Sequence, residues 1–435
     1  MPHLIVLGSV WPEPKSSAAG TRMVQLLEEF QRSDWRITFA SAALPSPHRL
    51  DLPARGIAEA AVELNADSFD HWLAEQAPDA VLFDRFMTEE QFGWRVERTC
   101  PNAVRLLDTE DLHSLRAARW ARLKRRQSLA GSEAERQSVG PETAAPDELF
   151  QEMADSDLLQ RELAAIYRCD LSLMISEFEM QLLTDTFEVP PTLLMYLPLW
   201  ASPEPNPLPF ESREHFVSIG NFRHAPNWDA VLWLKHDLWP PLRAALPDAE
   251  LHLYGAYPPP KATALHNPRQ GFRVLGWAED ARQVMGRARV CLAPLRFGAG
   301  IKGKLLDAMV CGTPSVTTSI GAEAMADPDR WPGAVADDAD ALVAAAVALY
   351  RDQTRWHSAQ AESRTTLSQR FSPQRFEGAL LDRLHTLQTT LVDHRRRNIV
   401  GTMLRHHQHR STQYMNQWIE AKNRLAARDD SHNSP

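Results

Sequence analysis

The sequence predicts an α/β protein in which two doubly wound parallel-sheet domains face each other across a cleft. Three observations support this prediction. Short apolar runs of strand length alternate with amphipathic segments from the start of the chain, and a second such alternation begins at Phe216. A proline-rich stretch, 198–209, separates the two series. The 435 residues are enough to build two large cores.

The first series predicts an N-terminal domain, residues 1–200. It opens with a strand over 4–7, a loop of small residues and an amphipathic helix over 21–31. That loop lacks the GxGxxG spacing of dinucleotide sites, which disfavours a nicotinamide or flavin enzyme. Further strands are expected at 37–40, 80–83, 103–107, 171–176 and 193–197, with helices around 70–76 and 89–98.

A charged stretch over 114–165 interrupts this domain. Its first part, 116–126, is a basic run around Trp120, and 128–148 is expected to form a loop rich in Ser, Glu, Ala and Pro. We interpret the basic run as a solvated helix face, because charge runs are commonly exposed. Contact with an anionic acceptor or with a membrane surface is the alternative.

The second series predicts a C-terminal domain over 210–375, followed by a helix and polar tail over 376–435. His406, His407 and His409 in the tail have no carboxylate or cysteine arranged around them, so no metal site is expected. The strands expected in this domain are 216–219, 250–254, 272–275, 290–295 and 315–318, and the helices are 228–245, 278–288, 301–310, 339–350 and 376–391.

Composition narrows the class of protein. A formal net charge of −9 argues against a protein that coats nucleic acid. The four cysteines lack metal-ligand or disulfide-framework spacing, which fits a reducing compartment. The first residues have no basic region, and their apolar run is too short to span a bilayer. We therefore expect a cytoplasmic location, with the basic run as the part that would touch the inner face of the membrane.

The most informative stretch, 289–325, is predicted to form a buried strand, a glycine turn, a helix and a second strand. Gly298 and Gly300 supply the permissive backbone that the turn needs. The free amides at the helix start, with Lys302 and Lys304 beside them, predict an anion site. A phosphate group is the expected ligand.

FGAGIKGKLLDAMVCGTPSVTTSIGAEAM resembles the C-terminal signature of retaining glycosyltransferases of the two-Rossmann-domain (GT-B) type, in particular glycosyltransferase family 4. FVSIGNFRHAPNWDAVLWL, LHLYGA, VLGWAED and ARVCLAPLR precede it in the order of that family, whereas DTEDLHSLR is the best match in the first 200 residues. The resemblance implies two Rossmann-like domains, a nucleotide-sugar donor held mainly by the C-terminal domain, and an acceptor held mainly by the N-terminal one. It implies no obligatory metal and no cofactor.

The resemblance also implies roles for individual residues. Asp307 stands at the second glutamate of the family's Glu-x7-Glu motif, which binds ribose hydroxyls, and Ala299 stands at the first. Asn221 and Pro226 stand where relatives carry the arginine and lysine that bind the diphosphate. We expect Lys302 and Lys304 to replace them, with Arg223 and His224 in reserve. The full expected donor site is Ala19, Gly20, Asn221, Arg223, Gly298, Ala299, Gly300, Ile301, Lys302, Lys304 and Asp307.

His113 resembles the N-domain histidine that faces the donor sugar, with a helix residue making a local bond as the alternative. We expect His113 and Lys302 to be the catalytic residues, and Glu323 to cap the next short helix. The loop acids expected to orient acceptor hydroxyls, unless they are merely solvated, are Asp108, Glu110 and Asp111.

These expectations combine into a hexosyltransferase-like enzyme. It would move a sugar from a nucleotide-diphosphate donor to a glycan, a lipid-linked saccharide or another glycoconjugate, with retention and without metal. One alternative is a nucleotide-sugar epimerase or hydrolase of the same fold. The other is a non-catalytic partner subunit, suggested by the substitutions at Ala299 and Asn221.

Overall fold

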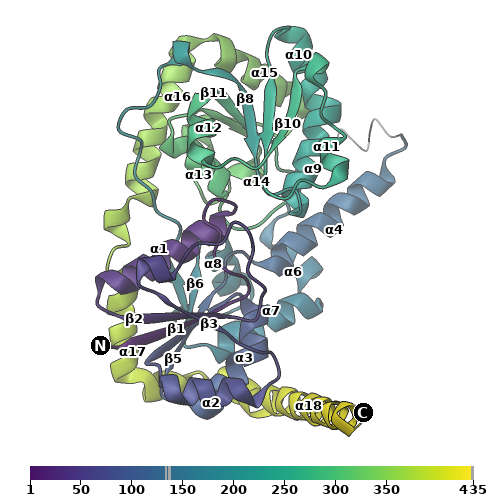
Figure 1. Cartoon of the computed structure of the whole chain (residues 1–435). Coiled ribbons are helices and arrows are strands. Elements are labelled where there is room, and N and C mark those ends of the chain that lie inside the picture. Colours follow the sequence, from purple (N-terminus) through teal and green to yellow (C-terminus); the bar gives the residue numbers. More distant parts are fainter. Residues whose placement is uncertain (133–134, 136–138, 433–435) are drawn as a thin grey trace.

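The computed structural model describes residues 1–132, 135 and 139–432, which build two parallel sheets stacked one above the other (Figure 1). Helices flank each sheet, and the chain passes from the first sheet to the second through the proline-rich residues 197–213. The predicted α/β fold with two doubly wound parallel sheets is therefore confirmed.

The first half contains a seven-stranded sheet in the order β3-β2-β1-β4-β5-β6-β7. Its central strands are buried on both faces, so each appears in the sequence as a continuous apolar run. The strands are β1 (His3–Gly8), β2 (Arg36–Ser41), β3 (Ala58–Ala61), β4 (Ala80–Asp84), β5 (Val104–Asp108), β6 (Leu171–Met174) and β7 (Leu194–Tyr196). The helices are α1 (Ala18–Arg32), α2 (Asp67–Gln76), α3 (Phe86–Thr99), α4 (His113–Leu129), α6 (Pro146–Met153), α7 (Asp157–Arg168) and α8 (Glu177–Gln181).

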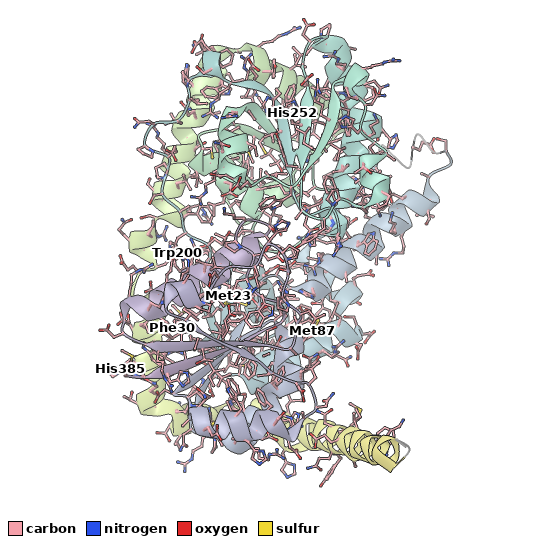
Figure 2. All side chains as sticks on the ribbon, in the orientation of Figure 1. Met23, Phe30, Met87, Trp200, His252 and His385 are labelled. Carbon is pink, nitrogen blue, oxygen red and sulfur yellow. The ribbon has the colours of Figure 1, made fainter. Side chains whose placement is uncertain are left out.

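Helix α1 shows how local sequence sets these elements. Ser17 caps its first turn, because its hydroxyl accepts the Gly20 amide at 3.0 Å. Met23 and Phe30, both labelled in Figure 2, lie on the apolar face of α1 and are buried in the core against the sheet. The start of α1 is thereby held at the end of β1, facing the second half.

The second half contains a six-stranded sheet in the order β10-β9-β8-β11-β12-β13. The strands are β8 (Glu214–Ile219), β9 (Leu251–Tyr254), β10 (Phe272–Gly276), β11 (Ala288–Ala293), β12 (Ser315–Thr317) and β13 (Gly333–Val335). The helices are α9 (Ala225–Trp233), α10 (Trp239–Ala245), α11 (Pro260–Thr263), α12 (Ala281–Arg287), α13 (Gly303–Val310), α14 (Ser319–Ala322), α15 (Ala339–Arg351) and α16 (Gln353–Thr366).

Several elements differ from the sequence prediction, and helix α16 is one that was not expected. Strands β3 and β13 were not expected, because each is a short edge strand without a buried apolar run. The helix expected over 228–245 is two helices, α9 and α10, joined by a π-helical turn. Pro240 stands in the first turn of α10, where its ring and missing N–H end the continuous helix.

The charged stretch 114–165 folds mainly into α4, α6 and α7. The loop expected over 128–148 overlaps the end of α4 and the start of α6, and its residues 133–134 and 136–138 lie outside the described residues. The acidic residues of α6 and of the segment before it lie within ion-pair distance of Arg122, Arg125 and Arg126 on α4. The positive charge of the basic run is thus largely matched.

The last two helices, α17 (Ala379–Arg397) and α18 (Ile399–His432), return to the first half (Figure 1). Leu380, Leu384 and Leu387 on α17 join the core that contains α1. Helix α18 packs on α7 and α3, and the side chains of His407 and His409 lie outside the described residues. Within the described part of the chain, no helix combines the length and apolar character needed to cross a membrane.

Asp170 fastens α17 to the first sheet, and its replacement tests this attachment. Its carboxylate accepts Arg395 Nε at 2.8 Å and Nη2 at 2.7 Å, and also accepts the backbone amide of Arg105 at 2.8 Å. Burial would raise the pKa of Asp170, but Arg395 and Arg105 lower it below its usual value. The ion pair therefore stabilises the fold above the unfolded pKa, and this contribution is lost as the pH falls through the folded pKa.

We expect Asp170→Asn to lower the free energy of unfolding by about 3 kcal/mol, because two guanidinium groups lose their counter-charge in a buried setting. Urea unfolding at neutral pH measures this loss. Asp393→Asn is the matched control, because Asp393 is exposed and its ion pair within the described residues is with exposed Arg396, at 3.5 Å; a change within about 0.5 kcal/mol is expected there. Equal losses in the two variants would contradict the assignment.

Candidate active site

A cavity of about 520 Å³ lies between the two halves. It opens at the carboxyl ends of both parallel sheets, where ligands of such sheets bind, and its volume suits a small organic ligand. The first half contributes the residues before and at the start of α1, the loop after β5 and the start of α4. The second half contributes the loops after β8 and β11 and the start of α13. Among the lining residues are Ser17, Ala18, Ala19, Arg85, Glu110, Asp111, His113, Arg116, Asn221, His224, Asn227, Gly298, Ala299, Ile301, Lys302, Lys304 and Asp307.

Three helix starts converge on this cavity. Helices α1, α9 and α13 begin immediately after Ser17, His224 and Lys302, and all three of these residues line the cavity. Helix α13 begins at Gly303, two residues later than expected, so Lys302 precedes its first turn. A Cβ atom on Gly303 would collide with the Cβ of Ala18, so α13 and α1 touch across the cavity. Convergent helix starts favour a negatively charged ligand, because their free amides and dipoles point toward it.

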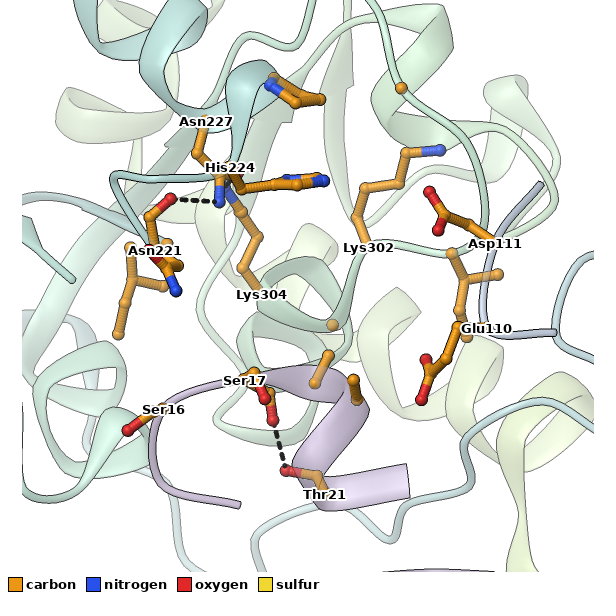
Figure 3. A pocket seen from close by; sticks show the side chains of 18 of the residues that line it. Ser16, Ser17, Thr21, Glu110, Asp111, Asn221, His224, Asn227, Lys302 and Lys304 are labelled. Carbon is orange, nitrogen blue, oxygen red and sulfur yellow. Dashed lines mark hydrogen bonds between the residues drawn. The ribbon is translucent and has the colours of Figure 1, made fainter. Parts of the chain in front are cut away.

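The two expected lysines lie in this region. Figure 3 shows them between Asn221, His224 and Asn227 on one side and Glu110 and Asp111 on the other. Lys302 Nζ donates to the Gly300 carbonyl at 2.6 Å, and Lys304 Nζ donates to Asn227 Oδ1 at 2.7 Å. Burial lowers the pKa of Lys302 and lowers that of Lys304 to about 8. Both ammonium groups are therefore poorly hydrated cations that an anionic ligand would stabilise.

The turn before α13 is shaped by Gly300. Its φ of +62° lies in the left-handed region, and an added Cβ would stand 2.9 Å from the Cβ of Asp111. Its amide donates to Glu179 Oε1 at 2.6 Å, from the first half. Gly298, in contrast, has no positive φ and an added Cβ would meet only ordinary contacts. The need for glycine that we expected at both positions therefore holds for Gly300 alone.

The opposite wall carries two carboxyl groups of different character. Glu110 has a left-handed backbone (φ 58°), is 8% exposed, and its Oε1 has no hydrogen-bond partner among the described residues. Burial and the nearby Asp108 raise the pKa of Glu110 to about 8. Burial would also raise the pKa of Asp111, but Arg116 and His113 lower it instead. Near neutral pH the cavity thus presents a protonated acid beside an ionised one.

Two histidines in the cavity are neutral near pH 7. Burial lowers the pKa of His113 to about 4 and that of His224 to about 4. His113 Nε2 lies 3.6 Å from Asp111 Oδ1, and the ring packs edge-on against Phe86. His113 therefore lines the cavity, at the start of the helix that follows β5.

Four expected site residues lie away from the cavity lining that the structure describes. Asp108 forms a buried ion pair with Arg22, at 2.8 Å. It therefore stabilises the fold and does not reach the cavity to orient acceptor hydroxyls. Gly20 packs against the backbone of Glu13, with which an added Cβ atom would collide. Arg223 lies over the ring of Tyr257, 4.8 Å from its centroid, and Gly300 serves the turn. Asp307 does line the cavity, and it pairs with Arg282 at 3.2 Å.

Sequence reasoning missed or misjudged other site residues. Arg85 lines the cavity directly after β4, a position at a strand end that could have singled it out. Arg116 and Arg119 were placed on a solvated face, yet Arg116 pairs with Asp111 in the cavity and Arg119 is buried. Glu323 does not cap the start of α14, which Thr318 caps; it follows α14 and pairs with Arg119 at 2.6 Å.

The described ranges bring together no group of three or more His, Cys, Asp or Glu side chains suited to holding a metal ion.

Comparisons with known proteins identify the second half and the overall fold. Residues 213–352 match the family described as glycosyl transferases group 1. No curated protein matches the sequence.

Three solved structures are similar over most of the chain. Sucrose-phosphate synthase from Thermosynechococcus elongatus is 15% identical over 90% of this chain and 100% of its own, with a TM-score of 0.62. Anabaena HepE in complex with UDP-glucose is 11% identical over 89% and 100%, with a TM-score of 0.60. A glycosyltransferase from Rickettsia africae is 10% identical over 89% and 98%, with a TM-score of 0.60.

The family match falls on β8 to α15, the part that carries α13 and the two lysines, and the structural likeness extends over both sheets. Residues 213–352 therefore match the group 1 glycosyltransferase family, and the chain as a whole has the two-domain GT-B fold of these solved structures.

Proposed function

We propose that this protein transfers a sugar from a nucleoside-diphosphate sugar to a hydroxyl group of a glycan, a lipid-linked saccharide or another glycoconjugate, with retention and without metal. One observation carries the proposal: the start of α13, with Lys302 and Lys304, faces Glu110, Asp111 and His113 across one cavity. The first set suits a diphosphate, and the second suits a hydroxyl-bearing acceptor. Anabaena HepE, which shares the fold, has been solved with UDP and with UDP-glucose, and this supports a nucleotide-sugar donor here.

The chemistry follows from the charges. The bond from the sugar's anomeric carbon to the diphosphate oxygen breaks, and negative charge develops on that oxygen. The amides at the start of α13 and the two buried ammonium groups stabilise this charge. The acceptor oxygen bonds to the anomeric carbon on the same face, and its proton passes to the departing phosphate oxygen. No protein nucleophile is required by this route.

The first half orients the sugar and the acceptor. Protonated Glu110 donates a hydrogen bond, ionised Asp111 accepts one, and neutral His113 can do either. A cavity wall with both hydrogen-bond donors and acceptors suits hydroxyl groups, because a hydroxyl group can donate and accept hydrogen bonds. In this proposal Asp307 accepts hydrogen bonds from the ribose hydroxyls, in exchange for its contact with Arg282.

A nucleotide-sugar epimerase or hydrolase is the second candidate. It is favoured by one feature, the pair formed by Glu110 and Asp111, because carboxyl groups whose pKa values are pushed apart can act as acid and base. Incubation with a panel of nucleotide sugars, with and without acceptor extracts, separates the candidates. Nucleoside diphosphate release that requires acceptor supports transfer, and release or sugar conversion without acceptor supports the second candidate. Absence of donor binding leaves a non-catalytic subunit.

Replacing Lys302 tests the diphosphate site. Lys302→Ala should weaken nucleotide-sugar affinity roughly 10- to 100-fold, because a buried charge-assisted hydrogen bond to phosphate is lost. Titration calorimetry with the donor that the panel identifies measures this change. Lys124→Ala is the control, since Lys124 is exposed on α4 and, among the described residues, its ammonium group bonds Gln127 in the same helix. Unchanged affinity in Lys302→Ala would exclude this role.

Lys304 gives a pH signature. Its pKa of about 8 in the free protein means that the ammonium group loses its proton as the pH rises through that value. A bound diphosphate favours the charged form and raises the pKa, so binding should take up protons and weaken between about pH 7 and about pH 9. Calorimetry in buffers of different ionisation enthalpy detects the uptake. Lys304→Arg should reduce both effects, and equal uptake in this variant would refute the assignment.

Glu110 tests the acceptor wall. Because this carboxyl group is protonated near neutral pH, Glu110→Gln should retain most activity there, while Glu110→Ala should lower kcat/KM for the acceptor about tenfold. Steady-state kinetics with the acceptor varied give the comparison, and the KM for the donor should be the same in both variants. If glutamine proves as harmful as alanine, the ionised carboxylate is the active form and the proposed role of Glu110 is wrong.

A further inference from the structure

Helix α4 belongs to the first half by its origin but lies against the second half (Figure 1). It begins at His113 in the cavity, packs on α6 and α7, and then reaches the loop between β11 and α13. The middle residues of α4 have no role in the proposed transfer reaction. Yet the contacts that they make with the second half are more specific than general packing.

Arg119 makes the most extensive of these contacts. It is 1% exposed, and its Nη1 donates to the Gly298 carbonyl at 2.8 Å. Nη1 and Nη2 also donate to the two carboxylate oxygens of Glu323, at 2.8 and 2.6 Å. Its guanidinium lies over the ring of Phe178, 5.1 Å from the centroid. One side chain of the first half thus binds two separate groups of the second half, the Gly298 carbonyl and the Glu323 carboxylate.

Neighbouring contacts fix the same loop. The ring of Trp120 stacks on Phe297 with centroids 5.8 Å apart and planes 8° apart. The Arg296 carbonyl accepts the backbone amide of Glu142 at 2.8 Å. The Gly300 amide also donates to Glu179. The first half therefore contacts this loop at four residues, 296, 297, 298 and 300.

This loop in turn determines where Lys302 lies. Lys302 Nζ donates to the Gly300 carbonyl, and Lys302 immediately precedes α13. A shift of the 297–301 backbone would therefore move the ammonium group and the first amides of α13 together. A buried Arg–Glu pair is an inefficient way to gain stability, because desolvating both charges offsets much of their attraction. Its bidentate geometry does, however, fix the relative position of the groups it joins.

We propose that Arg119 is a positioning residue for the diphosphate site: from the first half of the molecule it fixes the 297–301 turn on which Lys302 is mounted. The inference rests on the proposed function, because it takes this site to bind a diphosphate. It also means that the site is complete only while α4 lies against the second half. Arg119 itself does not line the cavity as described and acts through the turn.

The experiment compares the full-length protein with Arg119→Gln, using UDP as the probe. The variant should bind UDP roughly tenfold more weakly, because a small displacement of Lys302 removes well-aligned contacts. Hydrogen exchange should accelerate in peptides covering 297–301 and stay unchanged in β4, which would separate local release of the turn from general destabilisation. Arg125→Gln is the matched control, since Arg125 lies on the same helix, its side chain is 56% exposed, and it pairs with Glu152 within the first half.

A lower melting temperature in Arg119→Gln, with UDP affinity and exchange at 297–301 both unchanged, would overturn the proposal and leave Arg119 a purely structural role. If Arg119→Gln does not fold, Arg119→Lys and Glu323→Gln are measured in the same way, and unchanged affinity and exchange in both would overturn it equally. If the unmodified protein binds neither UDP nor another nucleoside diphosphate, the proposed function fails. The exchange measurement then still decides whether Arg119 fixes the turn.

Discussion

Close approach of the two halves at two glycines is the constraint on which the site depends. A side chain at Gly303 would collide with Ala18 at the start of α1, and one at Gly300 would press against Asp111. Because neither glycine has a side chain, the starts of α1 and α13 meet and their amides face one cavity. The positive ends of two helices repel each other, so this arrangement gains from an anion between them.

The fold could be predicted because each central strand can be recognised from its own residues. A strand that is covered on both faces must be apolar throughout, and such runs are visible without knowledge of their partners. Edge strands β3 and β13 lack that signature, since one side has no neighbouring strand and burial is partial. Pro240 was visible, but the apolar residues on both sides of it suggested one continuous helix.

The site could be predicted where it is contiguous in sequence and not where it joins distant segments. The turn and helix from Gly298 to Asp307 form one short stretch, and seven of the expected donor residues lie there. Arg119 and Glu323 are 204 residues apart, and Glu179 and Gly300 are 121 residues apart. Nothing in a single sequence pairs such residues. For the same reason the basic run of α4 seemed solvated, because its carboxylate partners are supplied by other segments.

The alanine at 299 becomes understandable in this setting. The resemblance assigns relatives a glutamate at this position, and its loss is one of the two substitutions that suggest the alternative of a non-catalytic partner subunit. In the structure the next residue, Gly300, donates its amide to Glu179 and lies against Asp111, so two carboxyl groups of the first half already adjoin the turn. They repel each other, and burial together with Asp111 raises the pKa of Glu179 to about 8. A third carboxylate at 299 would add to this repulsion in a poorly hydrated site, whereas alanine packs against the apolar core of the first half. The acidic groups at the turn are therefore supplied across the interface, by the first half of the molecule.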